Sequence, residues 1–253
     1  MSSRLPDIMR EPKDWTNGEL QALIAAFLPA IERDTQVPLR INYEQYHCGD
    51  EGCVYFARCA TLGDVVLKIG INQFYDEAYG DKASDFLVSA QIVGLFLPGV
   101  ARVFGVWQKD QEYFALLRER VSTDWLLFRS AEAGCLSQMP DPDEDEGVND
   151  VEAALYQVGQ RHHRDCAPGE HGFIDDEDAR LVLVEYGLSS LRVGLTALKK
   201  HGICAGFDLR LDNVGYRRVS GGHEAVMLDI GTAAPEGQPF VKEPRVANCR
   251  GKR

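Results

Sequence analysis

The first forty residues carry an apolar pattern with a helical period. The positions that recur on one face are Leu20, Leu23, Ile24, Phe27 and Ile31. Spacings of three and four residues are those of an amphipathic helix. Thr16 and Glu19 have the spacing of a capping box, so the helix is expected to begin near them. Pro29 is expected to kink or end this helix, because an internal proline removes a hydrogen bond and clashes with the preceding turn.

From about Pro38 the helical pattern gives way to short segments rich in valine and tyrosine. Glycines such as Gly63 separate them, which is typical of strands joined by tight turns. A helix is expected over about 74–97, and a hairpin turn at Lys109 and Asp110. The expected strands are 39–47, 53–60, 64–70, 100–107 and 113–121. Together these segments predict a small five-stranded antiparallel sheet with a helix packed on it.

The second half of the chain predicts a long helix and then a hairpin. Apolar residues recur at helical intervals from about Asp178 to Lys200. They are Leu181, Val184, Leu188, Leu191, Leu195 and Leu198. Two short strands are expected at 214–218 and 225–228. An acidic insert at about 139–150 is interpreted as a solvated loop.

The composition is that of a globular protein, and it limits the classes of partner that the protein is expected to bind. Of the 253 residues, 45% are apolar and 26% are charged. Lys and Arg total 27 against 39 Asp and Glu, a net charge of −12, which disfavours nucleic-acid binding because phosphate contacts need clustered cations. The longest apolar stretch, 22–31, is about half of the ~20 residues that a membrane-spanning helix needs. Neither a membrane span nor a signal peptide is expected.

The cysteines also bear on where the protein works. Seven cysteines, an odd number, are scattered along a long chain. This usage predicts reduced thiols and a cytoplasmic location rather than a disulfide framework. Whether that cytoplasm is the protein's own or that of a host cell after delivery stays open.

Four separated segments carry candidate chemistry, and the first two lie among the early strands. Gly49 and Gly52 stand in a turn between two strands, where glycines let backbone N–H groups approach phosphate oxygens. Val65–Lys68 is an apolar strand that ends on a lysine. An inward-facing ammonium group needs a partner, such as a phosphate or a carboxylate, because an unpaired buried charge is costly.

The other two segments follow the long helix. Asp208 precedes Asn213 by five positions in a loop between the helix and a strand. Such a pair can orient a hydroxyl group and hold a metal ion. Asp229 leaves an apolar strand and is followed by Gly231. Each segment alone also fits an ordinary turn.

Taken in order, the four segments resemble the protein-kinase-like superfamily, which combines a Gly-rich loop, a strand lysine, a loop with Asp and Asn, and a later Asp. The resemblance spans about 39–231. It implies a two-lobed α+β fold, with an N-terminal helical extension at 1–36, an N-lobe at 37–121, a reduced helical C-lobe at 122–231 and a basic tail at 232–253. It also implies an ATP- and Mg²⁺-dependent phosphotransferase.

The resemblance assigns catalytic and metal-binding roles. Lys68 would neutralise the α- and β-phosphates of ATP. Asn213 and Asp229 would ligate Mg²⁺, which prefers oxygen donors. Asp208 would orient the attacking hydroxyl and accept its proton, and Arg210 would lie near the γ-phosphate during transfer.

It also assigns residues to the nucleobase. Val54 and Val66 would cover the adenine, and the backbone of Glu119 and Val121 would hydrogen-bond its edge. Glu77 is the preferred carboxylate partner of Lys68. Two further carboxylates that follow it at helical spacing, Asp81 and Asp85, stay open as alternatives.

The chain departs from the family pattern in ways that affect the substrate. Gly206 and Phe207 replace the His-Arg of regulated kinases, His47 replaces the first glycine of the loop, and few residues follow Gly231. This resembles a truncated, unregulated kinase of bacterial or phage type. The favoured substrate is a protein Ser or Thr hydroxyl. A small molecule such as an aminoglycoside or a sugar is the alternative, and a nucleotide-binding scaffold without activity is a third reading. The oligomeric state is open.

Two remaining groups are assigned no chemistry. Three histidines and a cysteine lie within ten residues: His162, His163, Cys166 and His171. Without a second ligand cluster they are interpreted as polar loop residues rather than as a zinc site. The basic tail is interpreted as disordered terminal charge.

Overall fold

The structure is a computed structural model of the chain. It describes residues 4–49, 52–71, 85–110, 112–123, 151–159, 180–181, 183–184, 186–203, 209–220, 222–229 and 245–246. The chain divides into two compact units. Unit 1 comprises Met1–Leu95, Arg102–Arg120 and Glu236–Arg253, and unit 2 comprises Phe96–Ala101 and Val121–Pro235. Among the described helices, none is long and apolar enough to cross a membrane.

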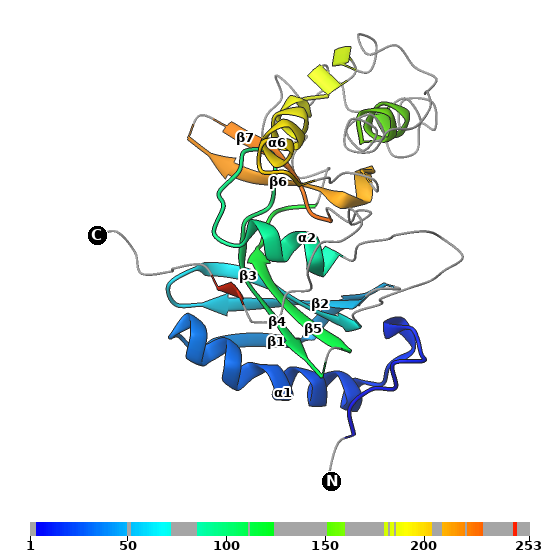
Figure 1. Ribbon diagram of the computed structural model, residues 1–253, viewed down its shortest axis with the longest axis vertical. Coiled ribbons are helices and arrows are strands. Elements are labelled where there is room, and N and C mark those ends of the chain that lie inside the picture. The colour runs from blue at the N-terminus through cyan, green and yellow to red at the C-terminus, as the bar shows by residue number, and fades with distance from the viewer. Residues whose placement is uncertain are drawn as a thin grey trace. The chain divides into compact units, whose positions relative to one another are not determined.

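Unit 1 is built on an antiparallel sheet in the order β1-β2-β3-β5-β4-β8 (Figure 1). The strands are β1 (Leu39–Cys48), β2 (Gly52–Cys59), β3 (Gly63–Ile71), β4 (Val103–Lys109), β5 (Tyr113–Glu119) and β8 (Arg245–Val246). The expected five-stranded antiparallel sheet is confirmed, and the overall class is mixed α+β. The short β8 adds a sixth strand from a tail in which the sequence predicts no element.

Helix α1 (Asn17–Thr35) begins at the predicted capping box. The Thr16 hydroxyl accepts from the Glu19 N–H, and the Glu19 carboxylate accepts from the Thr16 N–H at 2.8 Å. The expectation that the helix ends at Pro29 is wrong, because the helix continues to Thr35, whereas the alternative of a kink at Pro29 stays a prediction. A proline inside a helix costs ~3 kcal/mol. Continuing past it buries Ile31 completely, and each such side chain contributes ~1.5–3 kcal/mol.

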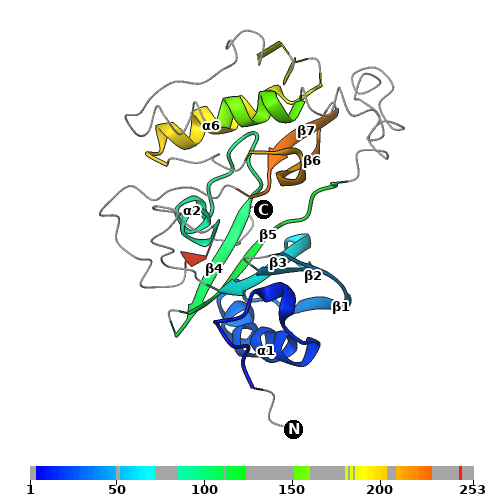
Figure 2. The ribbon, with the colours of Figure 1, turned by 90° about the vertical axis from the view of Figure 1, so that its right-hand side faces the viewer.

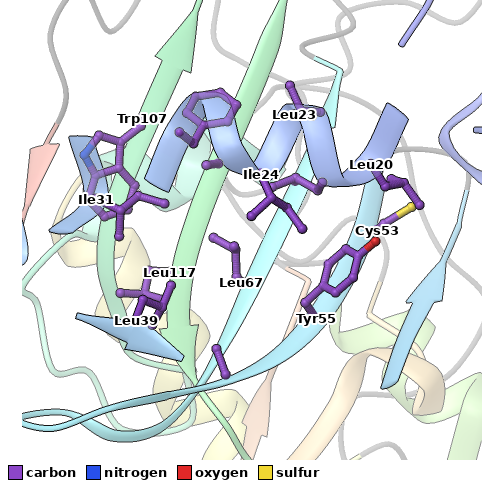
Figure 3. Close-up of a cluster of buried hydrophobic side chains, with 14 of the residues drawn as sticks. Leu20, Leu23, Ile24, Ile31, Leu39, Cys53, Tyr55, Leu67, Trp107 and Leu117 are labelled. Atoms are coloured by element: carbon purple, nitrogen blue, oxygen red, sulfur yellow. The ribbon is translucent and has the colours of Figure 1, made fainter. Parts of the chain in front are cut away.

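The two faces of the sheet differ because successive side chains along a strand point to opposite sides. Alternate residues of β2, β3 and β5 pack with α1 in one apolar cluster, in which Leu20, Ile24, Tyr55 and Leu67 take part (Figure 3). The intervening residues therefore lie on the other face. They include Val54, Phe56, Val66, Lys68, Leu116 and Arg118. We call this surface the Lys68 face.

Helix α2 (Asp85–Ile92) packs against β4 and β5, on the side of the sheet opposite α1 (Figures 1 and 2). The expectation that this helix runs to Leu97 is wrong. It ends at Ile92, where Gly94 adopts a positive φ of 76° and donates its N–H to the Val103 carbonyl at 3.1 Å. The pairing with β4 thus replaces the next helical turn. The expected start of this helix lies outside the described residues.

Unit 2 contains helical residues 151–159, helix α6 (Ser189–Lys200), the 3-10 turn η2 (Leu211–Asn213) and the hairpin of β6 (Val214–Val219) and β7 (Gly222–Met227). The expected uninterrupted helix over 178–200 is wrong. Gly187 adopts a positive φ of 69° in a turn before α6. Leu181 and Val184, upstream of this turn, are 51% and 55% exposed, whereas the predicted apolar residues from Leu188 onward are buried.

A close contact at Gly99 attaches the segment 96–101 to α6 and β7. Gly99 has a φ of +65°, and a Cβ atom there would lie 1.9 Å from the Ser190 carbonyl oxygen. Its N–H donates to the Glu224 carboxylate at 2.6 Å, and that carboxylate also accepts from Arg217 at 2.8 Å. The Gly99 carbonyl accepts from the Met227 N–H at 3.0 Å. These contacts fix the end of the hairpin that leads to Asp229.

Candidate functional site

The two glycines of the predicted turn are hydrogen-bonded to each other, and positions 50 and 51 between them lie outside the described residues. The Gly49 N–H donates to the Gly52 carbonyl at 2.9 Å, so this amide already has a partner within the turn. Gly49 is exposed, and nothing lies within 4 Å of the position of a Cβ. At Gly52, by contrast, a Cβ would lie 2.5 Å from the Ile69 carbonyl oxygen. Gly52 is thus required by the close approach of β2 to β3.

A disulfide between Cys48 and Cys53 brackets this turn. The expectation that the cysteines are reduced is wrong for this pair. The two residues stand directly opposite each other on β1 and β2, with their Cα atoms 4.0 Å apart. This proximity results from the register of β1 and β2. The number of cysteines in the sequence carries no information on that register. Cys59, further along β2, is a buried free thiol.

Lys68 lies on the same sheet face as the two valines that the sequence assigns to the nucleobase. It pairs with Val54 on β2 and with Leu116 on β5, and Val66 precedes it by two positions on the same face. Lys68 is only 5% exposed and Val66 6%. Burying an ammonium group requires compensating interactions. The structure therefore places a basic group on an otherwise largely apolar surface.

The carboxylate partner predicted for Lys68 lies outside the described residues. This applies to Glu77 and to the alternative Asp81, and also to the side chain of Asp85, whose backbone begins α2. The choice among the three stays a prediction.

Two arginines on the Lys68 face were not identified as site residues from the sequence. Arg118 is 8% exposed and stands directly opposite Val66. The guanidinium carbon of Arg120 lies 4.1 Å from the centre of the Phe56 ring, a cation–π contact. The sequence does contain a signal for Arg118, because an arginine stands there at an inward-facing position of the otherwise apolar strand 113–119. Nothing local to Arg120 indicated its contact with β2.

Glu119 and Val121 lie in different units. Glu119 ends β5, and its carboxylate accepts from the Arg102 N–H at 2.9 Å. Its own N–H donates to the Arg102 carbonyl at 2.9 Å. Val121 belongs to unit 2, where its side chain covers Gly215, and the following Ser122 exchanges two backbone hydrogen bonds with Tyr216, at 2.7 and 3.0 Å. The predicted linker thus runs from the end of β5 to the edge of β6.

Asn213 and Asp229 are brought together within unit 2. The Leu228 N–H donates to the Asn213 carbonyl at 2.7 Å, which places Asp229 one residue from this contact. Val214 and Met227, the adjacent pair, are in register on β6 and β7. Both candidate metal ligands are half-buried at the same end of the hairpin.

The turn that carries Asn213 is anchored from two sides. The Glu152 carboxylate accepts from the Leu211 N–H at 2.9 Å, and the Asn213 N–H donates to the Arg210 carbonyl at 2.9 Å. Leu209 is buried, whereas Arg210 is exposed. Asp208, the predicted catalytic carboxylate, lies outside the described residues. The same holds for the acidic insert and for the histidine and cysteine group that includes His162, so their interpretation is not altered.

The donor set at the end of the hairpin fits Mg²⁺. No group of three or more His, Cys, Asp or Glu side chains gathers anywhere in the described part of the chain. Mg²⁺ does not require such a cage, since it is usually bound through one or two protein oxygens together with phosphates and water. The carboxylate of Asp229 and the carboxamide of Asn213 supply two such oxygens.

Comparison with known proteins gives no family assignment: no protein-family model matches the chain, and no curated protein shows a significant match to it.

Proposed function

We propose that the protein is an ATP- and Mg²⁺-dependent phosphotransferase with a two-lobed, protein-kinase-like fold. Unit 1 would correspond to the nucleotide-binding lobe and unit 2 to the smaller helical lobe. The observation that carries this proposal is the burial of Lys68 on the sheet face shared by Val54 and Val66. A largely apolar surface with two buried cations, Lys68 and Arg118, suits a ligand that combines a flat base with a polyphosphate.

In the proposed reaction, unit 1 binds and orients the nucleotide. Val54 and Val66 contact the base, and the ammonium group of Lys68 offsets negative charge on the α- and β-phosphates. Removal of a basic group that stabilises developing charge typically lowers turnover by about 10²–10³-fold. Lys68 would therefore contribute mainly to the rate of transfer.

Unit 2 supplies the metal ligands and the acid–base group. Asn213 and Asp229 would hold Mg²⁺, which when bound neutralises phosphate charge during transfer. Asp208 orients the acceptor hydroxyl and takes its proton as the oxygen forms a bond to the γ-phosphorus. The bond from that phosphorus to the β–γ bridging oxygen breaks, and ADP leaves. Arg210 compensates charge on the transferred group.

The proposed acceptor is a Ser or Thr hydroxyl of a protein. Gly231 shortly after Asp229, and a cation two residues after Asp208, resemble protein kinases more than small-molecule kinases. A small cationic acceptor is the second candidate, favoured by the carboxylates of the segment Asp141–Glu146.

The test is transfer from γ-labelled ATP with Mg²⁺, with and without a cell lysate. Label on lysate proteins supports a protein kinase, and label only in small molecules supports the second candidate. Asp229→Ala is expected to abolish transfer. Asp212→Ala is the matched control, because it removes an exposed carboxylate from the same turn as Asn213. Full activity of Asp229→Ala, or ATP binding without any transfer, would contradict the proposal.

A further inference from the structure

A disulfide closes the glycine turn of unit 1, and the proposed reaction gives this bond no role. The Cys48–Cys53 disulfide joins the last residue of β1 to the second residue of β2. It lies next to the hydrogen bond from the Gly49 N–H to the Gly52 carbonyl. The strands are therefore tied together by a covalent bond immediately beside the turn.

The two sulfurs of this bond differ in accessibility. Cys53 is 0% exposed within the apolar cluster beneath α1, and its Sγ lies 3.6 Å from the Pro12 carbonyl oxygen. Cys48 is only half-buried and belongs to β1, an edge strand of the sheet. An attacking thiolate must reach the sulfur with which it forms the new bond, and the other sulfur of the disulfide is displaced. Attack at Cys48 is thus favoured, and the released Cys53 thiol has a hydrogen-bond acceptor beside it.

We propose that the Cys48–Cys53 disulfide is a reversible redox switch that lowers nucleotide affinity when it is closed. This inference rests on the proposed function, because the glycine turn can contact nucleotide phosphates only if the protein binds ATP. In the closed state the cross-link holds β1 and β2 together at the turn, and the Gly49 amide stays bonded to Gly52. Opening the bond lets the turn rearrange and offer this amide to a phosphate oxygen.

The switch acts on the turn without altering the other proposed nucleotide contacts. The side chain of Cys53 lies on the α1 side of β2, whereas Val54 lies on the Lys68 face. A change at the cysteines therefore leaves Val54, Val66 and Lys68 in place. The expected effect is that of a single hydrogen bond.

The reductant of the switch is a small thiol such as glutathione. Its thiolate attacks Cys48 Sγ, the bond between the cysteines breaks, and Cys53 leaves as a thiolate that takes up a proton. A second glutathione thiolate then attacks the glutathione sulfur of the mixed disulfide and frees Cys48. Two glutathione thiols become one glutathione disulfide, and the protein gains two electrons and two protons.

The experiment equilibrates the full chain in buffers of graded glutathione to glutathione disulfide ratio. Differential alkylation with mass spectrometry measures the state of Cys48 and Cys53, and calorimetric titration with ATP and Mg²⁺ measures affinity. The reduced protein is expected to bind ATP about three- to tenfold more tightly, the worth of one hydrogen bond. Cys48→Ser should bind like the reduced protein at every ratio. Cys59→Ala removes a buried free thiol from β2, the strand that carries Cys53, and should keep the dependence of ATP affinity on the glutathione ratio.

The outcomes separate this inference from the proposed function. Equal ATP affinity in both redox states, or no disulfide at Cys48 in the most oxidising buffer, overturns the switch while ATP binding itself still stands. A redox response that persists in Cys48→Ser also overturns it. Absence of ATP binding in either state would remove both the proposed function and the switch. Because Cys48 is half-buried, its serine variant avoids the cost of placing a hydroxyl in the core.

Discussion

The two faces of the unit 1 sheet show how the same strands serve two purposes. On the α1 face, residues such as Leu67 and Leu117 are fully buried in an apolar cluster. On the opposite face, the neighbouring residues Lys68 and Arg118 are almost as buried but carry charge. One position along a strand thus separates a residue that stabilises the fold from one that suits binding. Substitutions at adjacent positions can test this division.

The largest effect on stability is expected at Leu67. Leu67→Ala removes a completely buried side chain from the α1 face and leaves a cavity. Such substitutions cost ~2–5 kcal/mol of unfolding free energy. Urea denaturation measures this loss. Leu181→Ala, the same substitution at a residue that is 51% exposed, should change stability by no more than ~0.5 kcal/mol. A small effect at Leu67 would mean that α1 contributes little to the fold.

At Lys68 the larger effect is expected on activity. Lys68→Met replaces a buried ammonium group by an apolar side chain of similar volume, so it leaves no cavity of the kind that Leu67→Ala creates. Transfer from ATP should nevertheless fall about 10²–10³-fold. Lys109→Met is the control, because it makes the same change at a lysine of the same sheet whose amine lies 3.3 Å from Asp110. If Lys68→Met unfolds the protein or keeps full activity, the division between the faces fails at this residue.

A smaller effect is expected where α1 begins. Thr16→Ala removes the hydroxyl that accepts from the Glu19 N–H, and loss of such a cap costs ~1 kcal/mol. Thermal denaturation should show this loss without a change in the affinity for ATP. Thr196→Ala, which removes an exposed hydroxyl bonded to the Arg192 carbonyl within α6, should have a smaller effect.

The smallest effect depends on pH. Hydrogen bonds from the Thr16 backbone N–H and from its hydroxyl lower the pKa of Glu19, with a further contribution from the Arg10 charge. A carboxyl group with a lowered pKa stabilises the fold above its unfolded pKa, ordinarily 4.5, and loses this effect as the pH falls through the folded pKa. The stability difference between the wild type and Glu19→Gln should therefore shrink below about pH 4.5. An unchanged difference at lower pH would contradict the capping contribution.

The position of Arg118 opposite Val66 and the Arg120–Phe56 contact cannot be predicted from neighbouring residues in the sequence. The sequence indicates Lys68 because this residue ends an apolar strand, and it indicates Asn213 and Asp229 by their spacing and order. Arg118 belongs to the site because the strand register places it opposite Val66. Arg120 required knowledge of the strand that carries Phe56. Both depend on pairings between residues far apart in the chain.

The sequence by itself determined the elements whose signals are local: the capped start of α1, the five strands and the order of the candidate segments. Hydrophobic period, capping and turn residues act over a few neighbouring positions, so they can be read along the chain. Only the tertiary structure decided that α1 continues past Pro29, that α2 ends at Ile92 and that Cys48 bonds to Cys53. In each case a contact with a distant or opposing strand outweighs the local preference, and one-dimensional spacing does not contain that contact.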